Sequence, residues 1–260
     1  MNATAMGKRK IDAKRGETLA KWYLRLNGYF TVDNFIVHAA DDQGKIKNSN
    51  IGNYTETDLL GARHKYSKEV AGPVFVANDQ SLRDLRDSQI DFIIVEVKTG
   101  GGKKQKRPND IWRQKNLKVI EYILRFAGFF ESEELISKVA MELAEKGEYC
   151  SDNCKFSVRL ILISEKKANQ NWKHLTNVLF TNIIDFLVEV RGQSWLQAGI
   201  GVTSKHDQWD PLINNIFKIA NEGEDMFTPK EKKERIMGLL YEDISLTEKK
   251  DNFIEPAEKA

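Results

Sequence analysis

The sequence predicts an α/β fold in which helices flank a mixed β-sheet, with an appended helical segment at the C-terminal end. Two observations predict this class. Patterns typical of helices and strands alternate along the chain in the order helix, three strands, helix, two strands, helix. The chain has 260 residues, which is enough to bury one sizeable core. We therefore expect one core domain over residues 1–200 and a helical extension over residues 201–260.

The first half of the chain predicts one helix and three strands. Apolar and small residues recur at helical spacing in IDAKRGETLAKWYLRLNGYF, up to Asn27-Gly28, a typical helix end. Two strands are expected in YFTVDNFIVHA, which is dense in β-forming residues, and in YTETDLLGARH, which alternates. Residues 62–89 predict an elaborated connection, and residues 90–98 predict a strong, largely apolar strand.

The second half predicts helices around one long and one short strand. A helix is expected over residues 109–130 with Asp110 as its N-cap, and another in ELISKVAMELAEKG. KFSVRLILIS and NVLFT predict strands, and NIIDFLVEVRG predicts a helix closed by Gly192. The C-terminal extension predicts two helices, in DPLINNIFKIAN and in TPKEKKERIMGLLYEDI, the second with Thr228 and Glu231 as a capping box.

The composition limits the class of protein. Lys and Arg number 40 against 38 Asp and Glu, so the net charge of +2 does not by itself indicate an anionic partner. The sequence shows no signal pattern and no apolar run of membrane-spanning length, and it has only two cysteines. We therefore expect a cytoplasmic protein with no disulfide scaffold and no membrane partner.

The spacing of cysteine and histidine does not favour a zinc site. Cys150 and Cys154 would need two more ligands from distant parts of the chain. The four histidines are scattered without ligand spacing, at His38, His64, His174 and His206. Bystander thiols are therefore the favoured interpretation of the two cysteines.

Two ionisable residues stand at the end of the strand expected over residues 90–98. With a side-chain period of two, Glu96 and Lys98 share one face of that strand. Buried charges are costly unless they are paired or bound to something, so the simplest interpretation is a local ion pair. A second interpretation arises when Asp58, on an earlier strand of the same sheet, is added to the two.

Asp58 followed by Glu96-x-Lys98 resembles the motif of the PD-(D/E)xK nuclease superfamily, which includes many restriction endonucleases, Holliday-junction resolvases and phage exonucleases. Its members commonly begin with a helix that carries a Glu. A β-meander follows, whose second and third strands bear the motif, and then a helix and a fourth strand. Glu17 matches the helical Glu, and the resemblance covers about residues 10–192. It implies a restriction-endonuclease-like core.

The resemblance also implies a metal-dependent mechanism. Asp58 and Glu96 would offer carboxylate oxygens to Mg²⁺ or Mn²⁺, and the Val97 carbonyl would be a further ligand. Lys98 would orient the attacking water and stabilise charge on the scissile phosphate. Glu17 would join through a water, a second metal ion or Lys98. As an alternative, Glu17 is a first-turn acid that the helix dipole favours.

Other acids are weaker candidates for the site. Asp91 faces away from Glu96 in a regular strand and lies about 16 Å from it, so only a bulge would bring the two together. Glu56 shares the face of Asp58 and is the second choice for that acid, although a solvated strand residue is its simpler interpretation. Thr57 stands where the family has Pro.

Two basic stretches form the candidate phosphate-binding surface. GKRKIDAKR flanks Glu17, and KKQKR follows Lys98 after three glycines, which permit a close backbone approach. Both would contact phosphates and carry little base information. Their candidate residues are Lys8, Arg9, Lys10, Lys103, Lys104, Lys106 and Arg107. Gln114 and Lys118 on the following helix could also face a phosphate, although a solvated helix surface is favoured.

We therefore expect a metal-dependent nuclease that hydrolyses phosphodiester bonds of nucleic acid. DNA is expected ahead of RNA. Endonuclease is expected ahead of exonuclease, and that preference comes from the resemblance alone. One alternative is a catalytically silent nucleic-acid-binding protein of the same fold, and another is a non-enzymatic α/β scaffold for protein assembly. Pairing of two chains into a homodimer, to cut both strands, stays open.

Overall fold

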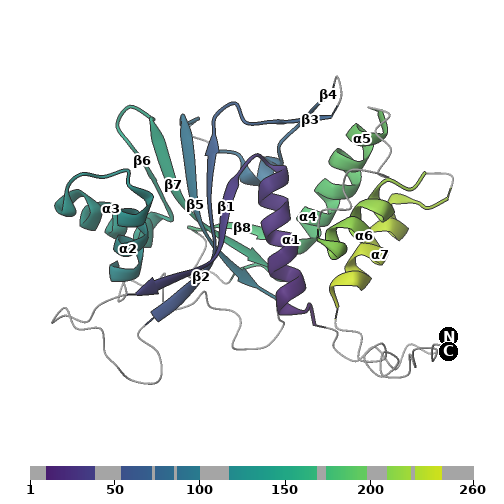
Figure 1. Cartoon of the computed structure of the whole chain (residues 1–260), viewed down its shortest axis with the longest axis horizontal. Coiled ribbons are helices and arrows are strands. Elements are labelled where there is room, and N and C mark those ends of the chain that lie inside the picture. The colour runs from purple at the N-terminus through teal and green to yellow at the C-terminus, as the bar shows by residue number, and fades with distance from the viewer. Residues whose placement is uncertain are drawn as a thin grey trace, which may run out of the picture.

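The computed structural model describes the chain over residues 10–38, 54–71, 74–84, 87–99, 117–168, 174–197, 210–223 and 226–241. Figure 1 shows a central β-sheet between two groups of helices. The sheet is mixed, because it contains both antiparallel and parallel pairs of strands. The predicted α/β class, with a mixed sheet flanked by helices, is confirmed.

Within the described part of the chain, the main sheet has six strands. β1, β2 and β5 form an antiparallel meander, and β7 pairs with β5 in parallel. On its other edge β7 pairs with β6 near its start and with β8 near its end. The bounds are β1 Phe30–His38, β2 Tyr54–His64, β5 Ile90–Lys98, β6 Glu148–Cys150, β7 Phe156–Ser164 and β8 Thr176–Leu179.

The two strands that carry the motif residues, β2 and β5, have the predicted bounds. The stretch between them is elaborated, as predicted, with a two-stranded antiparallel sheet and a short 3-10 turn. These elements are β3 Glu69–Ala71, β4 Val74–Val76 and η1 Gln80–Leu82. The sequence does not predict β6, because three half-buried residues give no periodic signal.

Helices cover both faces of the sheet (Figure 1). Alternate residues of β5 pack into one hydrophobic cluster with α1, α4, η6, α6 and α7, and into a second cluster with α2 and α3. On the first side the bounds are α1 Ala13–Leu26, α4 Phe180–Asp185, the π-helix η6 Phe186–Gly192, α6 Pro211–Ala220 and α7 Pro229–Leu240, and α5 Gln193–Gln197 follows η6. On the second side they are α2 Leu117–Ala127 and α3 Glu133–Lys146.

Side-chain caps explain where several helices begin and end. The Asp12 carboxylate accepts a hydrogen bond from the backbone N–H of Arg15 at 2.8 Å, at the start of α1. Gly28, with a φ of +83°, follows the end of that helix in a conformation that favours glycine. Thr228 and Glu231 form the predicted capping box of α7.

The prediction that Gly192 closes a helix is wrong, because the helical path continues from η6 into α5. A Cβ at Gly192 would lie 2.8 Å from the carbonyl oxygen of Ala220, so glycine here allows η6 to approach the end of α6. The strand predicted in NVLFT also differs from the structure. β8 ends at Leu179, and Phe180 already begins α4.

The helix predicted over residues 109–130 corresponds to α2, and its predicted N-cap Asp110 lies outside the described residues. α6 and α7 share the hydrophobic cluster of α1, and the backbone N–H of Asp12 donates to the carbonyl oxygen of Leu240 at 2.9 Å. A domain boundary at residue 200 stays a prediction. Among the described helices, none combines the length and apolar character that a membrane span requires.

Candidate active site

The carboxyl end of β5 places two ionisable residues within the sheet. Val95 packs in the cluster of α1, whereas Ile94 packs in the cluster of α2 and α3. By the same alternation Glu96 and Lys98 lie on the face of Ile94, as the period of two predicts. Glu96 is fully buried at this position.

Asp58 reaches the same end of β5 from β2. Its Oδ2 atom accepts a hydrogen bond from the backbone N–H of Val97, with the two atoms 2.6 Å apart. The antiparallel register pairs Leu59 with Val95, so one step further along β2 brings Asp58 opposite Glu96. The structure therefore places the Asp58 carboxylate beside the Glu96–Val97 peptide group.

Lys98 forms an ion pair with Glu96, between Nζ and Oε1. The Glu96 side chain is 1% exposed and the Lys98 side chain is 20% exposed, so the carboxylate is enclosed and the lysine is partly open to solvent. A carboxylate enclosed in this way is costly without a charged partner. The ion pair expected from the sequence is thus present, and it involves the same two residues as the nuclease motif.

An irregularity in β1 lies opposite Asp58. The pairing of β1 with β2 omits Asn34 and Asp58, which fall opposite one another in the register. Asn34 adopts a φ of +53°, a left-handed conformation that Asn tolerates better than most residues. Backbone strain of this kind is often found at functional sites. Sequence reasoning missed the irregularity, for which an Asn among β-forming residues is the only signal.

Glu17 lies on α1, whose first turns rest against the end of β5. A Cβ added at Gly16 would lie only 2.3 Å from Cγ2 of Thr99, the residue after Lys98. By alternation Thr99 belongs to the opposite face from Lys98, so α1 approaches the end of β5 from the other side of the sheet. The structure therefore brings α1, which carries the half-buried Glu17, to the end of the motif strand.

Sequence reasoning missed a further carboxylate at this end of the sheet. Glu165 follows β7, and its backbone N–H donates to the carbonyl oxygen of Lys98 at 3.1 Å. Burial raises the pKa of Glu165, against the opposing effect of the nearby Lys166 and Lys10 charges. Lys10, from the first basic stretch, therefore lies near the carboxyl end of the sheet. The parallel pairing of β5 with β7 is what reveals that Glu165 neighbours Lys98.

Asp91, the rival acid, lies at the other end of β5 and is held by the protein interior. Its carboxylate pairs with Arg159 at 2.6 Å and with Arg63 at 3.3 Å, and it accepts a hydrogen bond from the hydroxyl of Tyr29. Burial, followed by the Asp91 charge, raises the pKa of Tyr29. These partners account for a charged residue at this buried position.

The structure describes only some of the other predicted residues. Lys118 is exposed on α2. Glu56 lies in β2, but its side chain is outside the described part of the chain, and so is Gln114. The remaining basic residues also lie outside the described ranges, namely Lys8, Arg9, Lys103, Lys104, Lys106 and Arg107.

The donor set at the candidate site is small. Within the described residues, no group of three or more His, Cys, Asp or Glu side chains could hold a metal ion. Asp58 and Glu96 supply carboxylates, and Val97 has a backbone carbonyl. Mg²⁺ commonly keeps several waters and takes one or two protein carboxylates, so these oxygen donors fit it. Cys150 and Cys154 are free thiols, with their Sγ atoms 3.3 Å apart.

Comparisons of the chain with models of protein families, with curated proteins and with solved structures found no match.

Proposed function

We propose that this protein is a metal-dependent nuclease that hydrolyses phosphodiester bonds of DNA, as an endonuclease ahead of an exonuclease. The main observation behind this proposal is the position of the Asp58 carboxylate, which is bonded to the Val97 N–H beside Glu96 and Lys98. These residues come from two adjacent strands and meet at one end of the sheet.

The order of elements also supports the proposal. α1 is followed by the meander of β1, β2 and β5, then by α2 and α3, and then by β7, which is parallel to β5. The PD-(D/E)xK superfamily, which the motif resembles, has the same order of helix, meander, helix and strand. The motif residues lie on the second and third strands of the meander, as in that family.

Asp58 and Glu96 would hold the Mg²⁺ or Mn²⁺ ion, together with the Val97 carbonyl. When bound, the ion would lower the pKa of a coordinated water and offset charge on the scissile phosphate. Lys98 would orient the attacking water and stabilise charge that develops on the phosphate. In the structure this lysine pairs with Glu96, which keeps its ammonium group beside the metal-binding carboxylate.

The basic residues would bind the substrate by charge. Lys10 lies near Glu165 and thus near the proposed site, where it would contact phosphates that flank the scissile one. The cluster Lys103, Lys104, Lys106 and Arg107 follows Lys98 by a short glycine linker, so chain connectivity keeps it within reach of the same substrate. We place this activity in the cytoplasm, where free thiols such as Cys150 persist.

The test is cleavage of supercoiled plasmid DNA by the purified protein, with Mg²⁺ and with a chelator. We expect cleavage only with Mg²⁺, and a loss of at least about 10²-fold in Lys98→Ala, the usual scale for a positioned catalytic group. Lys155→Ala, at an exposed lysine before β7, is the matched control and should cleave as the wild type does. Circular dichroism should show that both variants are folded.

A second candidate function is suggested by the Glu96–Lys98 ion pair, which is complete without a metal ion. It is a catalytically silent nucleic-acid-binding protein of the same fold. Salt-sensitive DNA binding with no Mg²⁺-dependent cleavage would select this function. If the protein neither bound nor cleaved DNA, a scaffold for protein assembly would be the remaining interpretation.

A further inference from the structure

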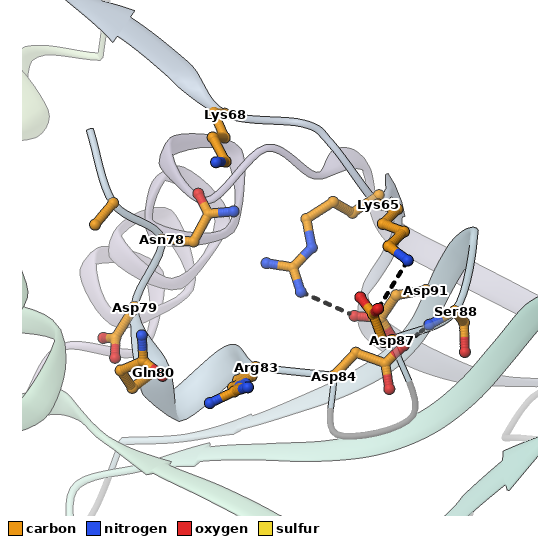
Figure 2. A pocket seen from close by; sticks show the side chains of 12 residues that line it. Lys65, Lys68, Asn78, Asp79, Gln80, Arg83, Asp84, Asp87, Ser88 and Asp91 are labelled. Carbon is orange, nitrogen blue, oxygen red and sulfur yellow. Dashed lines mark hydrogen bonds and ion pairs between the residues drawn. The ribbon is translucent and has the colours of Figure 1, made fainter. Parts of the chain in front are cut away.

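A polar cavity lies at the amino end of β5, the end away from Glu96 and Lys98. Its volume is about 310 Å³, which is at the lower end of the range for small-molecule sites. Figure 2 shows Lys68 and Asn78 on one side of this cavity, and Arg83 and Asp84 across from them. The lining residues come from the end of β2, from the stretches on both sides of η1, and from the start of β5.

The aspartates in the cavity wall already have donors within the protein. Asp87 pairs with Lys65 at 2.7 Å, and Asp91 pairs with Arg63 and Arg159. The carboxylate of Asp84 accepts hydrogen bonds from the Ser88 N–H at 2.9 Å and from the Ser157 hydroxyl at 3.2 Å. That of Asp79 accepts from the Tyr23 hydroxyl and the Ser81 N–H, both at 2.8 Å.

The cationic side chains of the cavity wall have fewer partners within the protein. Within the described residues, neither Lys68 nor Arg83 forms an ion pair. Arg63 has a side chain that is 9% exposed, and its guanidinium already pairs with Asp91 and donates to the carbonyl oxygens of Asn27 and Leu82. Lys68, after β2, and Arg83, after η1, are therefore the two cations of the wall that stay available to an anionic ligand.

We propose that this cavity binds a small phosphorylated molecule with a hydroxyl-bearing body. Lys68 and Arg83 have donors for the terminal oxygens of a phosphate monoester, which carries about −1.5 to −2 charges at neutral pH, and Arg63 adds positive charge to the wall. A carboxylate offers only two oxygens in one plane. The carboxylates of Asp79 and Asp84 oppose a bare phosphate ion but accept hydrogen bonds from hydroxyl groups, so they favour a sugar phosphate over inorganic phosphate.

Isothermal titration calorimetry tests this proposal with three probes, ribose 5-phosphate, inorganic phosphate and ribose, at constant ionic strength. The wild type should bind ribose 5-phosphate more tightly than inorganic phosphate, and should not bind ribose measurably. The double variant Lys68→Gln/Arg83→Gln should bind ribose 5-phosphate at least about tenfold more weakly, because charge-assisted hydrogen bonds to the phosphate are lost. Both substituted side chains are exposed, so the fold should be kept.

Two matched variants separate this site from other surfaces. Lys138→Gln changes an exposed lysine on α3, and Lys98→Ala changes the proposed nuclease site, so both should bind ribose 5-phosphate as the wild type does. Unchanged affinity in the double variant would overturn the proposal, and so would loss of binding in Lys98→Ala. Displacement of ribose 5-phosphate by duplex DNA without terminal phosphates would also overturn it, since the cavity would then belong to a nucleic-acid surface.

Discussion

Glu96 carries a carboxylate in a strand whose side chains are almost all buried. The ion pair with Lys98 offsets the cost of burying this carboxylate. Asp58 brings a second carboxylate to the same place, where it accepts a hydrogen bond from the Val97 N–H. The two carboxylates held together at the end of β5 repel one another. A divalent cation would relieve this repulsion, which is the residue-scale reason to expect metal binding.

Asp58→Asn removes one of the two acids and should remove most of the stabilisation by metal. Saturating MgCl₂ should raise the melting temperature of the wild type, because a ligand that binds only the folded state stabilises it, by about 2.7 kcal/mol at 100 times its Kd. Scanning calorimetry at constant ionic strength measures the shift. Glu56→Gln, on the same strand, is the matched control and should keep it. An equal shift in Asp58→Asn would mean that another acid binds the ion.

The period of two is enough to predict that Glu96 and Lys98 share a face, because that rule is local to one strand. The bond between Asp58 and Val97 depends on the register of two strands that are joined by an elaborated connection, so the sequence does not determine it. The same holds for Glu165, which is brought to Lys98 by a parallel pairing across α2 and α3.

At the scale of elements, α1 packs against the end of the motif strand β5. Gly16→Ala should destabilise the fold, because its Cβ would lie 2.3 Å from Cγ2 of Thr99 and 3.2 Å from the ring of Phe180. Overpacking of this kind costs about 1–3 kcal/mol. Thermal unfolding measures the change in melting temperature.

Gly238→Ala is the matched control for this prediction, since Gly238 also lies within a helix, α7. No atom lies within 4 Å of an added Cβ there, so alanine should stabilise the helix by about 0.5–1 kcal/mol. If Gly16→Ala were as stable as Gly238→Ala, α1 would not rest against the end of β5.

Long elements with clear ends are predictable from the sequence, and short ones are not. β2 and β5 give enough alternating or apolar residues to fix their bounds, and α7 has its own capping box. Gly192 misleads, because a glycine that ends helices elsewhere is needed here for close contact with α6. That requirement comes from tertiary packing, which no local pattern reveals.

At the scale of the whole molecule, the two ends of β5 have different roles. The amino end holds the buried group of Asp91, Arg63 and Arg159, which joins β5 to β2 on one side and to β7 on the other. The carboxyl end holds the candidate site. A network that fixes the three central strands at one end would keep the motif strands in register at the other.

Asp91→Asn should therefore destabilise the whole fold, by about 3–5 kcal/mol, because both arginines lose their buried counter-charge. The control is Asp33→Asn, which breaks a surface ion pair with Lys21 and should cost no more than about 1 kcal/mol. Urea unfolding gives the free energy of unfolding for each variant. Equal losses in the two would show that the network does not hold the strands together.

Asp58 and Glu96 are proposed to share one divalent ion, and anomalous scattering from Mn²⁺ in crystals of the protein tests this most directly. We expect one peak within about 2.5 Å of a carboxylate oxygen from each residue, beside the Val97 carbonyl. Crystals of Asp58→Asn under the same conditions should lack the peak. A saturating Mn²⁺ soak of the wild type that shows no peak between these carboxylates, with the Lys98–Glu96 pair retained, would contradict a metal-dependent site at the end of β5.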